Sequence, residues 1–187
     1  MRVLDESWVW DGGRPSIDFV NTLRARRRTP VDTVATPDAL TTWLVTAGLL
    51  ADGAQPATDR DVAAAARLRD ALDALLGGSP TPRDLARIND CARRQSLPRL
   101  TDAAAVVPAR PGRSVQAALG LVAADAVALV ADGALALVKE CEHERCGIRF
   151  VDTSPARSRR WCAMRRCGNR TKAARHAGRS RLRSAQR

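Results

Sequence analysis

Four of the five cysteines in this chain fall within one short segment near its C-terminus. They are Cys141, Cys146, Cys162 and Cys167. In each pair four residues separate the two cysteines, and a glycine follows the second one. Two matching loops of this kind are typical of a tetrahedral site in which two thiolate pairs bind one Zn²⁺ ion. Because four thiolates close the coordination shell, the sequence predicts a structural zinc ion and not a catalytic one.

Few other side chains could bind a metal. His143 lies inside the first loop and is an alternative ligand, although a complete set of four thiolates favours an exposed position for it. His176 is expected on the surface of a helix. Cys91 stands alone in a helical pattern, where a thiol packs as a small hydrophobic side chain.

The positive charge of the chain is concentrated in the segment after Asp152. The chain has 31 Lys and Arg against 20 Asp and Glu, and 12 of the basic residues follow Asp152 with no acid among them. The first 152 residues therefore hold 19 basic and 20 acidic side chains. This asymmetry indicates an acidic partner, either nucleic acid or an anionic membrane. Beside a zinc module nucleic acid is favoured, with a solvated basic tail as the alternative.

The composition favours a helical protein without a membrane span. Aromatic residues make up only 3 % of the chain, and the hydrophobic residues are mainly Ala, Leu and Val, which suit close helix packing. The N-terminal residues lack the apolar stretch of a signal peptide, and the apolar run from 117 to 138 is broken by Asp125, Asp132 and Gly133. We expect a cytoplasmic protein, whose reducing surroundings favour metal binding over disulfides.

Capping signals place the helices. Thr36, Thr58, Thr81 and Ser114 each precede a segment with helical spacing of apolar residues. The sequence predicts helices from 16 to 23, 37 to near 48, 59 to 76, 82 to about 95 and 114 to about 137, a strand at 8–10 and a hairpin around 106–107. The expected fold is mainly α, with a helical N-terminal domain and small β element at 1–138, a four-cysteine zinc-finger module at 139–180 and a basic tail at 181–187.

The run Cys167-Gly168-Asn169-Arg170 resembles the signature of the CGNR zinc-finger family. The similarity extends from position 141 to about 179 and includes Phe150, Asp152, Ser154, the run 158–162, Met164 and Lys172. The segment 16–22, Ser-Ile-Asp-Phe-Val-Asn-Thr, resembles the domain that accompanies this finger, described as a putative stress-induced transcription regulator. The resemblance implies a DNA-binding protein of transcription regulation and stress response.

Several residues of the C-terminal segment have the chemistry to contact nucleic acid. They are Arg157, Arg159, Arg160, Asn169, Arg170, Lys172, Arg175 and Arg179. On a helix the last three lie on one face, where they would contact phosphates. Asn169 and Arg170 suit adenine and guanine edges. Alternatively, Asn169 caps a helix and Arg170 neutralises the zinc–thiolate centre. Trp161 is expected to anchor the module against Phe150 and Met164.

In the front domain Asp18, Asn21 and Thr22 form a polar cluster. They either line a ligand pocket or form a buried hydrogen-bond network, and the network is favoured. No catalytic triad, phosphate-binding glycine loop or carboxylate pair is evident, so we do not expect an enzyme.

DNA is favoured over RNA because aromatic residues for base stacking are scarce. The alternatives are an RNA- or ribosome-associated zinc protein, or a ligand-binding or enzymatic front domain that the finger targets. A small-molecule effector and a homodimer are compatible with the sequence.

Overall fold

A computed structural model describes residues 8–26, 29–104, 106–107 and 111–169, and these residues form a mainly helical fold. The helices are α1 (Pro15–Val20), α2 (Pro37–Thr46), α3 (Asp59–Leu76), α4 (Pro82–Ala92) and α5 (Val115–Ala131), with a 3₁₀ turn η1 (Ala134–Leu137) and a π-helical turn η2 (Met164–Gly168). The predicted fold class, a helical front part with small β elements followed by a four-cysteine module, is confirmed.

The helices begin where the sequence places their caps. Thr58 starts α3 with a capping box, in which its hydroxyl accepts from the Asp61 backbone N–H and the Asp61 carboxylate accepts from the Thr58 backbone N–H. Thr81 and Asp84 form the same arrangement at α4. Ser114 caps α5 by accepting from the backbone N–H of Ala117.

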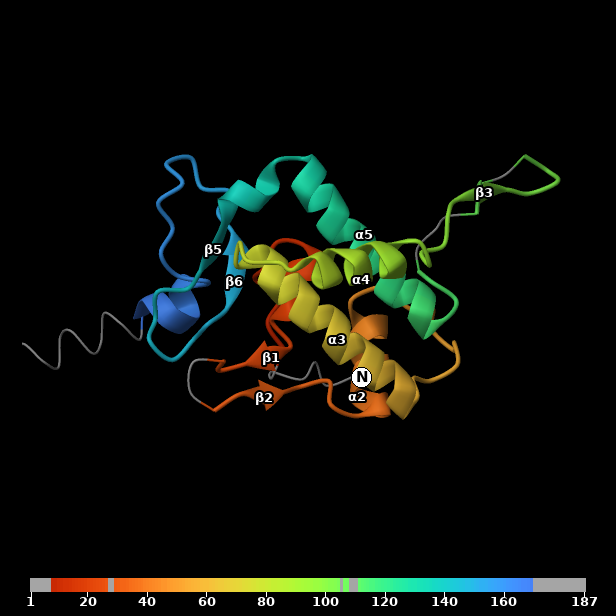
Figure 1. Cartoon of the computed structure of the whole chain (residues 1–187), viewed down its shortest axis with the longest axis horizontal. Coiled ribbons are helices and arrows are strands. Elements are labelled where there is room, and N and C mark those ends of the chain that lie inside the picture. Colours follow the sequence, from red (N-terminus) through yellow and green to blue (C-terminus); the bar gives the residue numbers. More distant parts are fainter. Residues whose placement is uncertain (1–7, 27–28, 105, 108–110, 170–187) are drawn as a thin grey trace, which may run out of the picture.

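The core of the front part lies between α3, α4 and α5, with α1 and α2 packed beside them (Figure 1). Phe19 of α1 and Trp43 of α2 are among the largest fully buried side chains, and the Trp43 ring stacks on Trp10 with 5.5 Å between ring centroids. Gly120 allows α5 to approach the end of α4, because a Cβ there would lie 2.5 Å from the backbone nitrogen of Gln95. None of the described helices is long and apolar enough to cross a lipid bilayer.

Three antiparallel hairpins complete the described structure. They pair β1 (Leu23–Arg24) with β2 (Val31–Asp32), β3 (Arg99–Leu100) with β4 (Val106–Val107), and β5 (Val138–Glu140) with β6 (Arg149–Val151). The β3–β4 hairpin, predicted around 106–107, projects from the helical body (Figure 1). The β5–β6 hairpin leads into the cysteine module, with only η1 between it and α5.

Three predictions from the sequence are wrong in detail. The helix expected at 16–23 ends at Val20, and Leu23 belongs to β1. The last long helix ends at Ala131 instead of near 137, because Gly133 adopts a left-handed conformation with φ of 68° and the chain continues as η1. Residues 8–10 form no strand, because no other strand pairs with them; Val9 is buried in the cysteine module, and the exposed Trp10 stacks on Trp43 of α2.

A buried ion pair holds the β1–β2 hairpin against α3. The Arg69 guanidinium donates two hydrogen bonds to the Asp32 carboxylate, at 2.7 and 2.5 Å, and a third to the Thr22 hydroxyl at 3.0 Å. The Arg69 side chain is 5 % exposed and that of Asp32 is 29 % exposed. Burial raises the pKa of Asp32, but the hydrogen bonds from Arg69 and Val34 lower it by more. The pKa of Asp32 therefore lies below its ordinary value.

Asp32→Ala is expected to lower the free energy of unfolding by about 3 kcal/mol, because it leaves the buried Arg69 charge unpaired. Asp90→Ala, which removes the partner of the exposed Arg93, is the matched control and should cost less than about 1 kcal/mol. Urea denaturation of both variants tests this. Since the native pKa of Asp32 is lowered, its contribution is present above pH ~4 and lost as the pH falls further. Equal losses in the two variants would contradict the assignment.

Candidate metal centre

The β5–β6 hairpin positions the first cysteine pair. Cys141 directly follows β5, and its backbone N–H donates to the Ile148 carbonyl at 2.8 Å. The chain then turns, with the Cys146 N–H donating to the His143 carbonyl at 2.8 Å. Gly147 follows in a left-handed conformation with φ of 70°, which L side chains rarely adopt. The glycine after the first pair therefore serves the tight turn that leads into β6.

The second pair lies on a separate loop that folds back onto the hairpin. The Glu142 N–H donates to the Arg160 carbonyl at 3.0 Å, which brings the loop beside the first pair. Cys167 lies in η2, where its N–H donates to the Ala163 carbonyl at 2.9 Å. Both loops thus direct their cysteines to one point.

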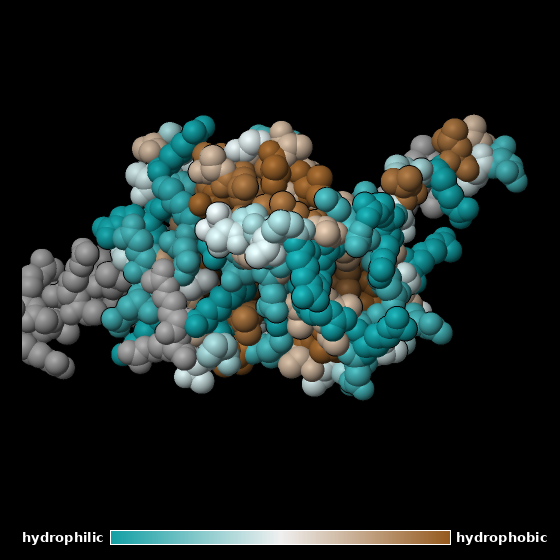
Figure 2. All heavy atoms as spheres, viewed as in Figure 1, coloured by the Kyte–Doolittle hydropathy of each residue, from teal (hydrophilic) through white to brown (hydrophobic). Residues whose placement is uncertain are grey.

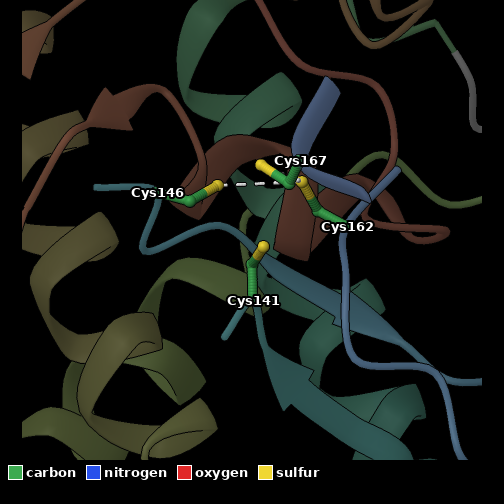
Figure 3. Close-up of side chains that lie close together, drawn as sticks. All are labelled: Cys141, Cys146, Cys162 and Cys167. Atoms are coloured by element: carbon green, nitrogen blue, oxygen red, sulfur yellow. Dashed lines mark hydrogen bonds between the residues drawn. The ribbon is translucent and has the colours of Figure 1, made fainter. Parts of the chain in front are cut away.

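The four sulfur atoms gather closely enough to bind one metal ion (Figure 3). All lie within 4.8 Å of one another, and the Cys162 sulfur is 3.7 Å from those of Cys146 and Cys167. Four sulfurs about 2.3 Å from a common zinc ion are separated by about 3.8 Å, whereas a disulfide bond is about 2.05 Å long. The spacing therefore fits zinc coordination and excludes disulfides among these residues.

Protons and a metal compete for this site. Hydrogen bonds with Cys141 and Cys146 raise the pKa of Cys162. Burial, together with the interaction with Cys146, raises the pKa of Cys167 to about 12. Hydrogen bonds from Cys146 and Cys162 lower the pKa of Cys141. Because like charges at this spacing repel, a full set of thiolates needs a cation. Zn²⁺ would be held by all four sulfurs and would supply the cross-link between the loops, with no open position for a substrate.

A second layer of contacts fixes the loop between the pairs. The buried carboxylate of Asp152 accepts from Lys139 Nζ at 2.7 Å, from the Ser154 hydroxyl at 2.6 Å and from the Arg159 backbone N–H at 2.9 Å. These hydrogen bonds hold the pKa of Asp152 well below its usual range, and the bond from Lys139 contributes most. The His143 Nδ1 accepts from the Arg145 N–H at 3.2 Å, and the alternative of His143 as a ligand is not supported.

The module has a small core that joins the front part. Val9, Ile148 and Phe150 are buried around the sulfurs, with Trp161 partly buried beside them. Met164, expected to pack there, is 50 % exposed. The amide of Asn21 donates to the Arg149 carbonyl and accepts from the Arg149 N–H, both at 2.9 Å.

Two ion pairs add to this attachment. Arg149 Nε lies 2.7 Å from a carboxylate oxygen of Asp73 on α3, and Arg166 lies 2.6 Å from Asp11. The module is therefore docked on the helical part through polar contacts at both of its loops.

The predicted nucleic-acid residues occupy different environments. Arg159 is half-buried: its guanidinium lies 4.4 Å from the Phe150 ring centroid and donates to the Trp161 carbonyl at 2.8 Å and to the Cys162 carbonyl. Arg157, Arg160 and Asn169 are exposed. Arg159 thus has a structural role, which separates it from its neighbours.

The remaining predicted contacts, Arg170, Lys172, Arg175 and Arg179, and the basic tail at 181–187 lie outside the described residues, as does His176.

Sequence reasoning missed two cations beside the sulfurs. Burial and the nearby Arg166 lower the pKa of Arg24 of β1. The charges of Cys146, Cys162 and Cys167 act in the opposite direction, which shows that Arg24 lies close to the sulfurs. Arg166 belongs to η2 and pairs with Asp11. No signal near the cysteines points to Arg24, because it lies more than a hundred positions earlier in the sequence.

The cluster of Asp18, Asn21 and Thr22 forms hydrogen bonds within the fold. Asn21 binds the Arg149 backbone, and the Thr22 hydroxyl donates to the Phe19 carbonyl at 2.7 Å. Asp18 accepts from the Gly12 N–H at 2.8 Å, and burial raises its pKa to about 7. These contacts support the hydrogen-bond network, and the ligand pocket stays an untested prediction.

Cys162→Ser is expected to abolish zinc binding and to unfold the module from 141 onward while α1 to α5 persist. Thiolate ligation contributes on the order of 10 kcal/mol to folding in isolated zinc fingers. Cys91→Ser is the matched control, because Cys91 lies outside the cluster and burial raises its pKa to about 11. Elemental analysis and hydrogen exchange measure the two effects. Purified wild type that folds normally without zinc would refute this prediction.

Two family models match the chain. One, ABATE, described as "Putative stress-induced transcription regulator", matches residues 13–133. The other, the CGNR zinc finger, matches residues 138–180 and covers all four cysteines. No curated protein matches the sequence. The cofactor prediction of zinc is supported by the finger family and by the sulfur geometry together. The chain belongs to the ABATE family of putative stress-induced transcription regulators and carries a zinc-binding CGNR finger at its C-terminal end.

Proposed function

We propose that this protein regulates transcription by binding double-stranded DNA through its zinc module. The observation that carries the proposal is the position of exposed arginines on loops that the metal site holds in place. Arg160 and Trp161 line a hollow of about 460 Å³ on the module surface, together with Ser158 and Met164. Arg157 and Arg165 are exposed on the same loops. The sequence after Asn169 is also basic.

The two adjacent arginines at 159 and 160 have different roles: Arg159 makes contacts within the fold, and Arg160 is exposed at the surface. Arg159 also lines the hollow, but its guanidinium donates to two carbonyls and packs on the Phe150 ring, so fewer of its donors are left for a phosphate. Arg160 is exposed, and its partner is the exposed Glu142 at 2.6 Å. An exposed pair of this kind contributes little to stability, so Arg160 can exchange Glu142 for a phosphate at low cost.

Duplex DNA suits this surface better than single-stranded RNA. Base stacking needs a free aromatic face, and the Arg160 guanidinium lies over the Trp161 ring, 5.2 Å from its centroid. Contacts by exposed arginines to phosphate give affinity without reading the sequence. Base reading by Asn169 and Arg170 stays a prediction.

In this proposal the helical front part carries the regulation, as a platform for an effector or for a second subunit. The two matched families are a regulator and a zinc finger and not enzyme families. A cytoplasmic location, a small-molecule effector and a homodimer belong to the proposal as expectations. A boundary between two domains at residue 138 is also an expectation of this proposal.

Arg160→Gln is expected to weaken binding of duplex DNA and to reduce the slope of log K against log salt by about 0.9, the value for one phosphate contact. Arg145→Gln is the matched control: Arg145 is an exposed arginine of the same module, also paired with a glutamate, but it does not line the hollow. Fluorescence anisotropy at several salt concentrations measures both, and zinc content confirms that each variant is folded.

If Arg160→Gln and Arg145→Gln bind DNA as the wild type does, this surface is not the interface. A wild-type protein that binds structured RNA but not duplex DNA would replace the proposal with the RNA alternative.

A further inference from the structure

Six arginines of the helical part surround two adjoining hollows of about 340 and 610 Å³. They are Arg60, Arg67, Arg83, Arg87, Arg94 and Arg113. Ala64 and Arg94 line both hollows, so the two are continuous. We refer to these six arginines and the hollows between them as the arginine groove. Hydrophilic residues gather over α3 and α4 in the space-filling view (Figure 2).

The groove arises from helical spacing on two neighbouring helices. Arg60 and Arg67 are seven positions apart on α3, and Arg83, Arg87 and Arg94 are separated by four and seven positions along α4 and its end. Residues at these separations share one face of a helix. Since α3 and α4 pack together, the two rows of cations face the same groove.

These arginines differ from others of the described structure in having no acidic partner there. Arg14, Arg26, Arg69 and Arg149 each form ion pairs that hold elements together. None of the six groove arginines has an ion pair with an acid of the described residues. All are exposed except Arg87, which is half-buried.

Two acids, Asp61 and Asp90, line the hollows beside the six arginines, and both are engaged by other groups. The Asp61 carboxylate accepts from the Thr58 backbone and from Gln116 Nε2, at 2.9 and 2.6 Å. Asp84 accepts from Thr81 in its capping box, and Asp90 pairs with Arg93. The groove therefore presents a surplus of positive charge that the fold itself does not use.

We propose that the arginine groove binds the phosphate backbone of the DNA that the zinc module contacts, as a second and sequence-independent contact. This inference rests on the function proposed above. Exposed arginines along an open groove suit an extended polyanion, whereas a small anion would need an enclosed site. Guanidinium groups also bind phosphates in bidentate fashion.

Helix α3 relates the groove to the zinc module. Asp73 on this helix pairs with Arg149 of β6, which lies beside the cysteines. At 1.5 Å per residue, Arg67 and Arg60 lie about 9 and 20 Å along the helix from Asp73. A span of 20 Å corresponds to about six base pairs, which is short compared with a duplex of about 30 base pairs.

The test measures anisotropy of the full-length protein on a labelled duplex of about 30 base pairs at several salt concentrations. Arg87→Gln with Arg94→Gln is expected to weaken binding and to reduce the salt slope by about 1.8, the value for two phosphate contacts. Arg87→Lys with Arg94→Lys keeps the charges and should retain most of the affinity. Zinc content and urea denaturation should be unchanged in both variants.

A second pair of variants provides a matched control on one helix. Ala64 lines both hollows, whereas the adjacent Ala63 is exposed and lines neither. Ala64→Glu and Ala63→Glu change the net charge equally, and at physiological salt charges are screened over about 8 Å. Ala64→Glu should weaken DNA binding more than Ala63→Glu does.

The outcomes separate this inference from the proposal on which it rests. If the Arg87 and Arg94 variants bind like the wild type while Arg160→Gln binds weakly, the groove inference is overturned and the zinc-module proposal stands. If the reverse holds, the groove alone contacts DNA. A wild type that binds no duplex at low salt overturns both, and a loss seen on RNA but not on DNA overturns the inference.

Discussion

Four sulfur atoms within 4.8 Å of one another are the constraint on which the C-terminal part depends. As thiolates they repel, and as thiols they cannot hold two loops together, so the arrangement has a stable form only around a cation. The hydrophobic residues that surround the sulfurs are few, chiefly Val9, Ile148 and Phe150. A core of this size does not offset the entropy of ordering the loops. The metal therefore stabilises the fold of this module, as helix packing stabilises the fold of the front part.

Strand β6 links the metal site to the helical core, because its residues alternate between the two. Phe150 packs into the cysteine cluster, whereas Val151 packs into the core of the front part. Arg149, between Ile148 and Phe150, faces the front part and is held by Asn21 and Asp73. A change at the metal site that shifts β6 would thus act on α1 and α3 through these contacts. That is a physical route by which the regulation proposed for the front part and the DNA binding proposed for the zinc module would influence each other.

The sequence predicted the features that depend on local chemistry. The caps at Thr58, Thr81 and Ser114 and the gathering of the four cysteines follow from residue type and spacing, and the structure shows both. The end of α5 was misjudged because the apolar pattern continues past Gly133, whose left-handed backbone ends the helix regardless of that pattern.

Contacts between distant parts of the chain could not be predicted. Asn21 and Arg149 are 128 positions apart, and nothing in either segment indicates that a side-chain amide would pair with the strand backbone. The neighbours Arg159 and Arg160 look equivalent in sequence, yet one packs on Phe150 and the other faces solvent. Which of two adjacent cations can bind a partner is decided by the tertiary fold.

Net charge gives a misleading picture of the front part for the same reason. Its 19 basic and 20 acidic residues nearly balance along the sequence up to Asp152, which suggests a surface of no particular sign. The fold separates them, because capping boxes engage Asp61 and Asp84, and ion pairs with structural arginines engage Asp32, Asp73 and Asp125. The six groove arginines form no ion pair with an acid of the described residues, and they outnumber Asp61 and Asp90, the two acids that line the same hollows. A sequence with balanced charge can therefore carry a local surplus of arginines, because the fold decides which acids lie beside them.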